Sequence, residues 1–277
     1  MLPWNYGFHW NTGHIVFLGA FYLVLATVAA TLIAAVRRSW RAVAAHQVEQ
    51  IGWREDFHDL PARDRVCRHA ITGEISCREC PHAFDCRECE THAKLIALHP
   101  LAAPDRAEED LFGLEFPLDR YYHRGHTWAR PEADGTVTVG LDDLGSRLLG
   151  KPDAVELPQP GAFLEVNGTA FRAQKRGADV RVLSPVDGEV VETGGPGRGW
   201  YLKVRPWETG ERAFRHLLRG PEIRPWVLRE MERLHLALAV PAGNFSLPDG
   251  GVAVADIAAS YPEADWDAVC GEMFLEP

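Results

Sequence analysis

The sequence predicts a mainly β fold with flanking helices, and three observations predict it. Between residues 119 and 207, short apolar runs of strand length alternate with glycine and proline, as in an all-β sandwich or barrel. Ile15 to Val36 form an uncharged apolar stretch of 22 residues, which is long enough to cross a bilayer as a helix. After Pro225, apolar residues recur at helical spacing. A β-domain is therefore expected between one N-terminal membrane helix and a short helical C-terminal region.

Bulk properties exclude some classes of function. The 277 residues give room for one or two compact domains with a sizeable core. The formal net charge of -10 argues against nucleic acid as a partner, because binding to phosphates requires a basic face. The chain has six cysteines, too few for a disulfide scaffold at this length. Five of them crowd between Cys67 and Cys89, which indicates a local site.

The apolar stretch predicts a single-pass anchor. We expect an outer tail at residues 1–13 and a transmembrane helix at 14–38. No Lys or Arg precedes the stretch, whereas Arg37, Arg38 and Arg41 follow it at once. The positive-inside rule then places the N-terminus outside an inner or plasma membrane and the rest of the chain in the cytoplasm. A buried helix of a soluble protein is the alternative, and a cleavable signal peptide would carry its charge first.

A juxtamembrane helix is expected next, over residues 39–60. Val43, Val48 and Ile51 lie among polar neighbours in an amphipathic pattern, and Pro61 breaks it. Its expected role is to space the cytoplasmic part from the bilayer.

Residues 61–100 are predicted to form a cysteine-rich metal-binding module. The spacing is Cys67-x9-Cys77-x2-Cys80-x5-Cys86-x2-Cys89, and two C-x-x-C pairs can place four thiolates around one ion. A segment with so few apolar residues would gain folding free energy from the metal. Cys77, Cys80, Cys86 and Cys89 form the symmetrical set, but Cys67 could replace Cys77. His69, His82 and His92 are further candidates. Zinc is the default for paired knuckles, and an iron–sulfur cluster fits the same spacing.

The β-domain can be divided into elements from its turns. Asp134-Gly135 is a hairpin signal between strands at Thr127–Arg130 and Thr136–Leu141. Asp143–Leu149 has the spacing of a short helix, with Gly150 and Pro152 after it. The further expected strands are Ala154–Leu157, Ala162–Val166, Ala170–Ala173, Val180–Leu183, Glu189–Glu192 and Tyr201–Arg205.

Landmarks of this region also match a known family. They are His126-Thr-Trp128, Asp134-Gly-Thr-Val-Thr-Val-Gly140, Leu148-Leu-Gly150, Val155-Glu-Leu-Pro158, Gly161, Gly168, Ser184-Pro-Val-Asp-Gly188 and Gly199-Trp-Tyr-Leu-Lys203. In this order they resemble the H-protein of the glycine cleavage system, a relative of the lipoyl and biotinyl domains. The resemblance implies a barrel-sandwich hybrid over residues 112–207. It also implies a hairpin whose tip lysine carries a lipoyl group.

The expected carrier hairpin is Ala170 to Pro185, with its tip at Lys175-Arg-Gly-Ala-Asp179. In H-proteins the lysine lies eight residues before the proline of the Pro-x-x-Gly turn, and here that position is Gly177. Lys175 lies two residues early, and Gln174 stands where an acidic residue is usual. Lys175 could be the lipoyl attachment site if the tip is shifted, because hairpin register follows loop length. The alternative is a solvated lysine. The Gly-rich linker Thr193–Gly199 is also shorter than the segment that the family usually has.

The C-terminal region, residues 208–277, is predicted to be helical. Pro225 suits a first-turn position of a helix through Leu238, with Val227, Met231, Leu234 and Leu238 on one face. Val252–Ser260 and Asp265–Phe274 are predicted as two short helices. Trp266, Cys270, Met273 and Phe274 share a face of the second, so Cys270 is expected to be a packed core thiol.

No catalytic constellation is found in the sequence. Asp142 and Asp143 suit a helix N-cap better than a pair of catalytic carboxylates, and His123 and His126 suit structural positions. We therefore expect no enzyme but a membrane-anchored, H-protein-like, non-catalytic carrier or scaffold for a cytoplasmic or membrane protein partner. The alternative is a membrane-tethered redox or zinc-bearing adaptor subunit of a respiratory-type complex.

Overall fold

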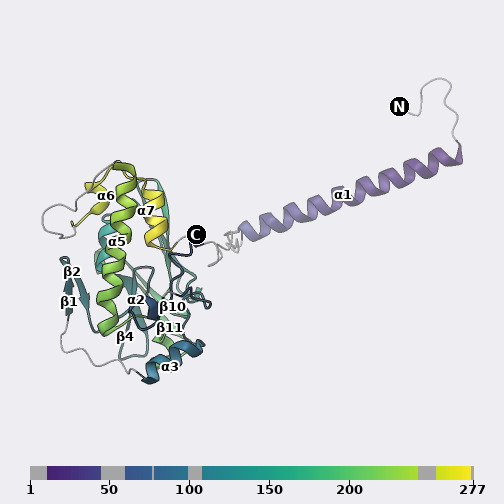
Figure 1. Cartoon of the computed structure of the whole chain (residues 1–277). Coiled ribbons are helices and arrows are strands. Elements are labelled where there is room, and N and C mark those ends of the chain that lie inside the picture. Colours follow the sequence, from purple (N-terminus) through teal and green to yellow (C-terminus); the bar gives the residue numbers. More distant parts are fainter. Residues whose placement is uncertain (1–10, 45–59, 77, 99–107, 243–253, 276–277) are drawn as a thin grey trace. The chain divides into compact units, whose positions relative to one another are not determined.

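The computed structural model describes residues 11–44, 60–76, 78–98, 108–242 and 254–275. The chain divides into two units, residues 1–54 and residues 55–277 (Figure 1). Within the first, α1 (Thr12–Ala44) is one continuous helix, and the side chain of the preceding residue, Asn11, accepts a hydrogen bond from the backbone N–H of His14. Its segment Thr12–Ala34 is long and apolar enough to span a membrane.

Two threonine side chains inside this apolar segment are satisfied locally. The hydroxyls of Thr27 and Thr31 each donate to the backbone carbonyl three residues earlier, at 2.8 Å. Such bonds allow threonine in a helix that lacks water around it. Residues 39–44 of the predicted juxtamembrane helix continue α1, and residues 45–59 lie outside the described residues.

The second unit is built on two antiparallel sheets. The larger has the strand order β3-β4-β5-β11-β10-β7, and the smaller has the order β6-β8-β9. Their strands are β3 (Tyr121–Tyr122), β4 (Thr127–Pro131), β5 (Val137–Leu141), β6 (Ala154–Glu156), β7 (Phe163–Leu164), β8 (Thr169–Lys175), β9 (Ala178–Leu183), β10 (Gly188–Gly195) and β11 (Trp200–Pro206). The mainly β fold with flanking helices is confirmed, and each strand predicted between residues 127 and 205 is present.

Packing between the sheets forms a single core. The rings of Phe171 on β8 and Tyr201 on β11 stack with centroids 4.4 Å apart. Alternate residues of β10 and β11, among them Val190, Leu202 and Val204, are buried in the same cluster. A bulge between Val190 and Glu192 shifts the register of β10 against β11, and such bulges increase the local twist and curvature of a sheet.

Two short elements follow the predicted local signals. Asp134 accepts from the backbone N–H of Thr136 at 2.9 Å, and Gly135 takes a positive φ of 81°, so the hairpin turn is formed as predicted. Helix α4 (Asp143–Leu149) begins at its N-cap Asp142, whose side chain accepts from the Gly145 N–H at 2.7 Å. This confirms the N-cap assignment of Asp142.

A separate two-stranded sheet precedes the β-domain and was not predicted. It pairs β1 (Glu108–Leu111) with β2 (Leu114–Pro117). Leu114 and Phe116 are fully buried, and Phe116 packs edge-on against Trp226 of the C-terminal region. The acidic start of β1 lacks the apolar alternation on which strand prediction depends.

The C-terminal helices share the core of the β-domain. Helix α5 (Ile223–Ala242) buries Trp226, Val227, Met231, Leu234 and Leu238, which confirms its predicted apolar face. Helix α7 (Trp266–Met273) lies beside α5 (Figure 1) and also packs against β9. Cys270 is 1% exposed, as expected of a core thiol. The helix predicted over 252–260 is confirmed for α6 (Ile257–Ser260), whose N-cap Asp256 is extended; residues 252 and 253 lie outside the described residues.

The cysteine-rich segment contains two short helices, α2 (Arg68–Ile71) and α3 (Glu90–Leu98). A single antiparallel bridge pairs Val66 with Glu79. Buried polar contacts fix this segment to the rest of the unit: Arg68 pairs with Glu222 just before α5, and Arg124 of the β-domain donates to the Val66 carbonyl at 2.8 Å.

Candidate functional site

The carrier hairpin is the first candidate site, and its tip is narrower than predicted. Lys175 on β8 pairs with Ala178 on β9, so the turn consists of Arg176 and Gly177. Both have positive φ angles, 51° and 87°, as a two-residue hairpin turn of this type requires. The predicted tip, Lys175 to Asp179, is therefore wrong at both ends, because Lys175, Ala178 and Asp179 belong to the strand ladder. Gly177, eight residues before Pro185, lies at the tip.

Lys175 is held within the protein surface. Its side chain is 8% exposed, and Nζ donates to the Lys151 backbone carbonyl at 2.9 Å. Nζ also lies 3.3 Å from a carboxylate oxygen of Asp256, which belongs to the segment before α6. The Lys175 ammonium group is thus bonded to a carbonyl and paired with a carboxylate. A swinging arm needs a freely exposed amine, and Lys175 does not provide one in this conformation.

Hydrogen bonds with Asp153 also hold the backbone of the turn. The backbone N–H of Arg176 donates to Asp153 at 2.8 Å, and the Asp153 N–H donates to the Gln174 carbonyl at 2.7 Å. Beside it lies an open cavity of about 530 Å³, lined by residues 150–155 together with Pro196 and Gly197. Part of the predicted Gly-rich linker is ordered here, since Thr193–Gly195 extends β10 and Pro196–Arg198 forms a 3₁₀ turn.

The cysteine segment is the second candidate site. The Cys67 N–H donates to the Arg78 carbonyl at 2.8 Å and the Cys80 N–H donates to the Arg65 carbonyl at 2.7 Å, so the two cysteines lie on the two strands that flank the Val66–Glu79 bridge. Cys67, Cys80 and Cys86 are buried, and Cys89 is half-buried. Cys77 lies outside the described residues.

Three of these thiols share one environment. Burial, together with the neighbouring Cys80 and Cys67, raises the pKa of Cys86 to about 12, although Arg68 opposes the rise. The pKa of Cys80 is raised by burial in the same way, with Cys67 again adding to it. The Cys89 N–H bonds to the Cys86 carbonyl at 3.3 Å in a turn that leads into α3. Within the described part of the chain, however, no group of three or more His, Cys, Asp or Glu side chains is arranged closely enough to hold a metal ion.

Two of the three histidines proposed as spare ligands bind each other. The rings of His69 and His92 are both buried, and their nitrogens Nε2 and Nδ1 lie 2.8 Å apart. The other His69 nitrogen bonds to Glu74. His82 is exposed. Two of the three spare histidines therefore form a buried pair with each other.

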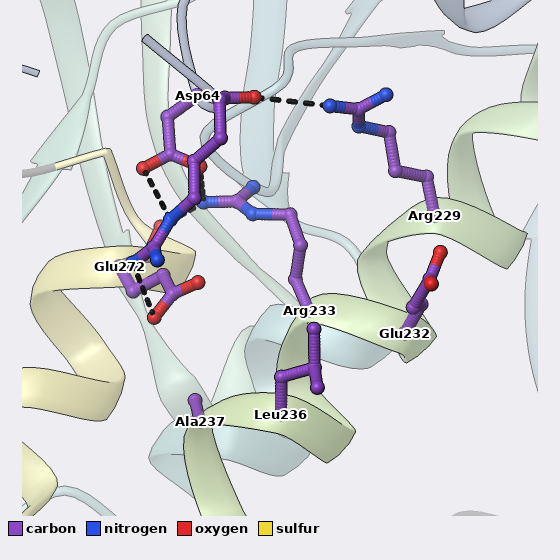
Figure 2. Close-up of a pocket in the computed structure, with 8 residues that line it drawn as sticks. Asp64, Arg229, Glu232, Arg233, Leu236, Ala237 and Glu272 are labelled. Atoms are coloured by element: carbon purple, nitrogen blue, oxygen red, sulfur yellow. Dashed lines mark hydrogen bonds and ion pairs between the residues drawn. The ribbon is translucent and has the colours of Figure 1, made fainter. Parts of the chain in front are cut away.

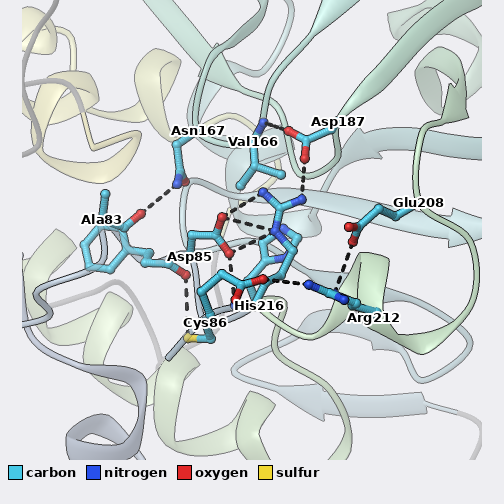
Figure 3. A network of polar contacts seen from close by, with 12 residues as sticks. Ala83, Asp85, Cys86, Val166, Asn167, Asp187, Glu208, Arg212 and His216 are labelled. Atoms are coloured by element: carbon cyan, nitrogen blue, oxygen red, sulfur yellow. Dashed lines mark hydrogen bonds and ion pairs between the residues drawn. The ribbon is translucent and has the colours of Figure 1, made fainter. Parts of the chain in front are cut away.

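A polar network joins the cysteine segment to the β-domain (Figure 3). Arg87 binds the carboxylates of Asp85 and Asp187, and Asp187 also accepts from the Val166 N–H at 2.6 Å. The Asn167 side-chain amide donates to the Ala83 carbonyl at 2.6 Å. The Pro-x-x-Gly turn of the β-domain thus contacts the cysteine segment directly, through Asp187.

Sequence reasoning did not foresee a buried charge network that surrounds His126. This histidine is 0% exposed; its Nδ1 lies 3.0 Å from Asp142, and its Nε2 lies 3.8 Å from Glu230. Although burial alone would lower the pKa of His126, the two carboxylates raise it to about 9. Burial likewise opposes ionisation of Glu230, but Arg233 and His126 lower its pKa to about 2.

Arg233 extends this network to the surface (Figure 2). It contacts Glu230 at 2.6 Å and Asp64 at 3.2 Å. A cavity of about 340 Å³ opens beside it, lined by Arg63, Asp64, Arg229, Glu232, Arg233, Leu236, Ala237 and Glu272. The network links α5 to the cysteine segment and to the β-domain, and so fixes the three parts together.

Comparison with known proteins agrees with this architecture. A family model described as glycine cleavage H-protein matches residues 120–195. The glycine cleavage system H protein 2 of Pseudomonas syringae pv. tomato is 36% identical over 102 residues, which cover 32% of this chain and 80% of that relative. The H protein of Halorhodospira halophila is 32% identical over 110 residues, 35% of this chain and 85% of the relative. The crystal structure of an H protein from Mycobacterium marinum is 25% identical with a TM-score of 0.34, and the match covers 41% of this chain and 98% of that one.

Proposed function

From the premise that this chain belongs to the glycine cleavage H-protein family through its β-domain, we propose that it is a membrane-tethered, non-catalytic scaffold. In this proposal the H-protein-like domain docks a cytoplasmic or membrane protein without carrying a lipoyl group. Folds are often kept while their original task is replaced.

The observation that carries the proposal is the state of Lys175. A carrier lysine must project from its hairpin so that the lipoylating enzyme and then the partner enzymes reach it. Here Nζ is bonded to the Lys151 carbonyl and paired with Asp256. The tip itself offers Arg176 and Gly177. The residues of this tip therefore do not fit a lipoyl group.

The membrane tether rests on α1. Its apolar segment has the length of a membrane span, and the arginines at 37, 38 and 41 follow that segment. An N-terminus outside the membrane and a cytoplasmic second unit are the topology that this charge distribution favours.

Intact-mass measurement after co-expression with a lipoylating enzyme tests the scaffold proposal. The full chain is expected to remain unmodified. The matched variant is Gly177→Lys, which restores a lysine at the family position; a Cβ there meets open space, but the φ of 87° strains any side chain, so the folding of this variant is checked by circular dichroism first. We expect this variant to gain the mass of a lipoyl group, more completely when Gln174→Glu is added. A lipoyl group on Lys175 of the unaltered chain would overturn the proposal.

A second candidate function is that of a metal-bearing adaptor, either a structural zinc site or an iron–sulfur site with a redox role. It is favoured by the shared environment of Cys67, Cys80 and Cys86 and by the turn that carries Cys89 into α3. For this candidate function we take Cys67, Cys80, Cys86 and Cys89 as the four ligands, the alternative set in which Cys67 replaces Cys77. Cysteine thiolates suit both zinc and iron–sulfur clusters, so the metal present decides between a structural and a redox role.

A further inference from the structure

The Asp256 carboxylate joins three parts of the protein that are distant in sequence. One oxygen caps α6 by accepting from the Ala259 N–H at 2.9 Å, and the other lies 3.3 Å from Lys175 Nζ. Lys175 in turn binds the carbonyl of Lys151, which follows α4. A single side chain therefore connects the C-terminal region, the carrier hairpin and the segment after α4.

The backbone at Gly150 makes room for this carboxylate. A Cβ added at residue 150 would lie 2.3 Å from the Asp256 carboxyl carbon, and the φ of Gly150 is +50°. Any larger side chain would thus collide with Asp256. The Asp256 carboxylate therefore lies directly against the Gly150 backbone.

Residues 254–260, which we name the latch segment, are anchored by a small apolar contact. Ile257 and Ala258 are buried, and α6 packs against α4. Asp256 itself stays 32% exposed. Although partial burial alone would raise the pKa of Asp256, hydrogen bonds from the Ala259 N–H and from Lys175 lower it. A short segment with few buried side chains can open locally without unfolding of the domain.

We propose that the latch segment controls chemical access to Lys175: Asp256 holds the Lys175 ammonium against the Lys151 carbonyl and so withholds it from acylation. This inference rests on the proposed function in one respect, because the closed latch is the state in which the domain has no available carrier amine. When the latch opens, Lys175 becomes an acyl acceptor one residue from the hairpin turn.

The reaction at a released Lys175 is an ordinary acyl transfer. The deprotonated Nζ forms an amide bond with the carbonyl carbon of an activated ester. The C–O bond to the leaving group breaks, the leaving group departs with that electron pair, and Nζ loses a proton to solvent. The co-reactant is an activated carboxylic acid.

Acetylation of the full chain in detergent micelles tests the latch. Sulfo-N-hydroxysuccinimide acetate is the probe, and peptide mass spectrometry measures the acetylation rate of Lys175 relative to Lys94, whose side chain is 75% exposed. Asp256→Asn removes the charge but keeps a side-chain acceptor for the α6 cap. Gly150→Ala leaves both partners chemically intact and displaces the carboxylate by collision. Asp265→Asn is the matched control, because Asp265 caps α7 through the Ala268 N–H at 3.2 Å and is not paired with Lys175.

We expect Asp256→Asn and Gly150→Ala each to raise the rate ratio of Lys175 to Lys94 by roughly fivefold, as loss of a partly exposed ion pair allows. Asp265→Asn should leave the ratio unchanged. The latch is overturned if the first two variants keep the ratio of the unaltered chain, or if Asp265→Asn raises it equally. These readouts do not depend on lipoylation, so failure of the latch and failure of the scaffold proposal are distinguishable.

Discussion

Arg68 and Glu222 form a buried ion pair that crosses 154 residues of sequence, with Arg68 Nε 3.0 Å from Glu222 Oε1. Both side chains are at most 6% exposed. The same guanidinium donates to the carbonyls of Arg215, at 2.8 Å, and Leu217, at 3.0 Å. The cysteine segment is therefore attached to the residues just before α5 by one arginine whose donors are nearly all used.

Replacement of Arg68 by methionine is expected to destabilise the protein by roughly 3–5 kcal/mol, because it leaves Glu222 charged, buried and unpaired. Urea unfolding of the full chain in micelles, followed by tryptophan fluorescence, measures the loss. Arg63→Met is the control, since the Arg63 side chain is 67% exposed and pairs at 3.5 Å with Glu272. Equal unfolding midpoints for the two variants would contradict the structural role of Arg68.

Stability should fall at alkaline pH because of His126. Its pKa is raised from 6.5 to about 9 in the folded protein, so its contribution is fully present below pH 6.5 and is lost as pH rises through 9. A shift of this size corresponds to roughly 3 kcal/mol. Urea midpoints measured between pH 6 and pH 10 should show this fall in the unaltered chain.

The variant His126→Gln should be less stable at pH 6 and should show a much smaller decline between pH 6.5 and pH 9. His235→Gln, on the same helix as Glu230, is the matched control and should keep the full decline. A decline of the same size in His126→Gln would assign the alkaline loss to other groups.

The sequence allowed prediction of those parts of the fold that depend on neighbours in the chain. The Asp134-Gly135 turn and the Asp142 N-cap were predicted correctly because a side chain in each bonds to a backbone group two or three residues away. The position of Lys175 was not predictable in this way. Its partner Asp256 is 81 residues distant, and a solvated lysine and a paired lysine have the same local sequence.

The charge network and the cysteine site show the same limit. The local sequence predicts that Glu230 is a solvated helix residue, and only the packing of α5 on the β-domain places it beside His126. Cysteine spacing left the choice between Cys67 and Cys77 open, and it did not reveal the Val66–Glu79 bridge, which places Cys67 opposite Arg78 and Cys80 opposite Arg65. Long-range pairing, not local pattern, carries this information.

The anchor prediction can be checked by fractionation. The full chain should stay with membranes after extraction with alkaline carbonate, whereas a chain lacking residues 1–38 should be found in the soluble fraction, because the apolar segment is removed. An Asp or Lys pair introduced at Val24 and Val28 should weaken retention strongly, since charges near the centre of a span cost about 2.5–3.5 kcal/mol each. Retention of the truncated chain on membranes would place the attachment elsewhere.

Metal content should depend on Cys67 and not on Cys77. After anaerobic purification of the full chain, elemental analysis is expected to find one metal site that is lost in Cys67→Ser, Cys80→Ser and Cys86→Ser, because those thiols share one buried environment. Cys77→Ser should retain the metal, and Cys270→Ser, a substitution of a core thiol 1% exposed, is the control for general destabilisation.

Zinc without visible absorbance would support a structural site, since Zn²⁺ has no redox chemistry. Iron with visible absorbance would support the redox role. Loss of the metal in Cys77→Ser but not in Cys67→Ser would restore the symmetrical ligand set, and an unaltered chain that contains no metal would remove the adaptor function altogether.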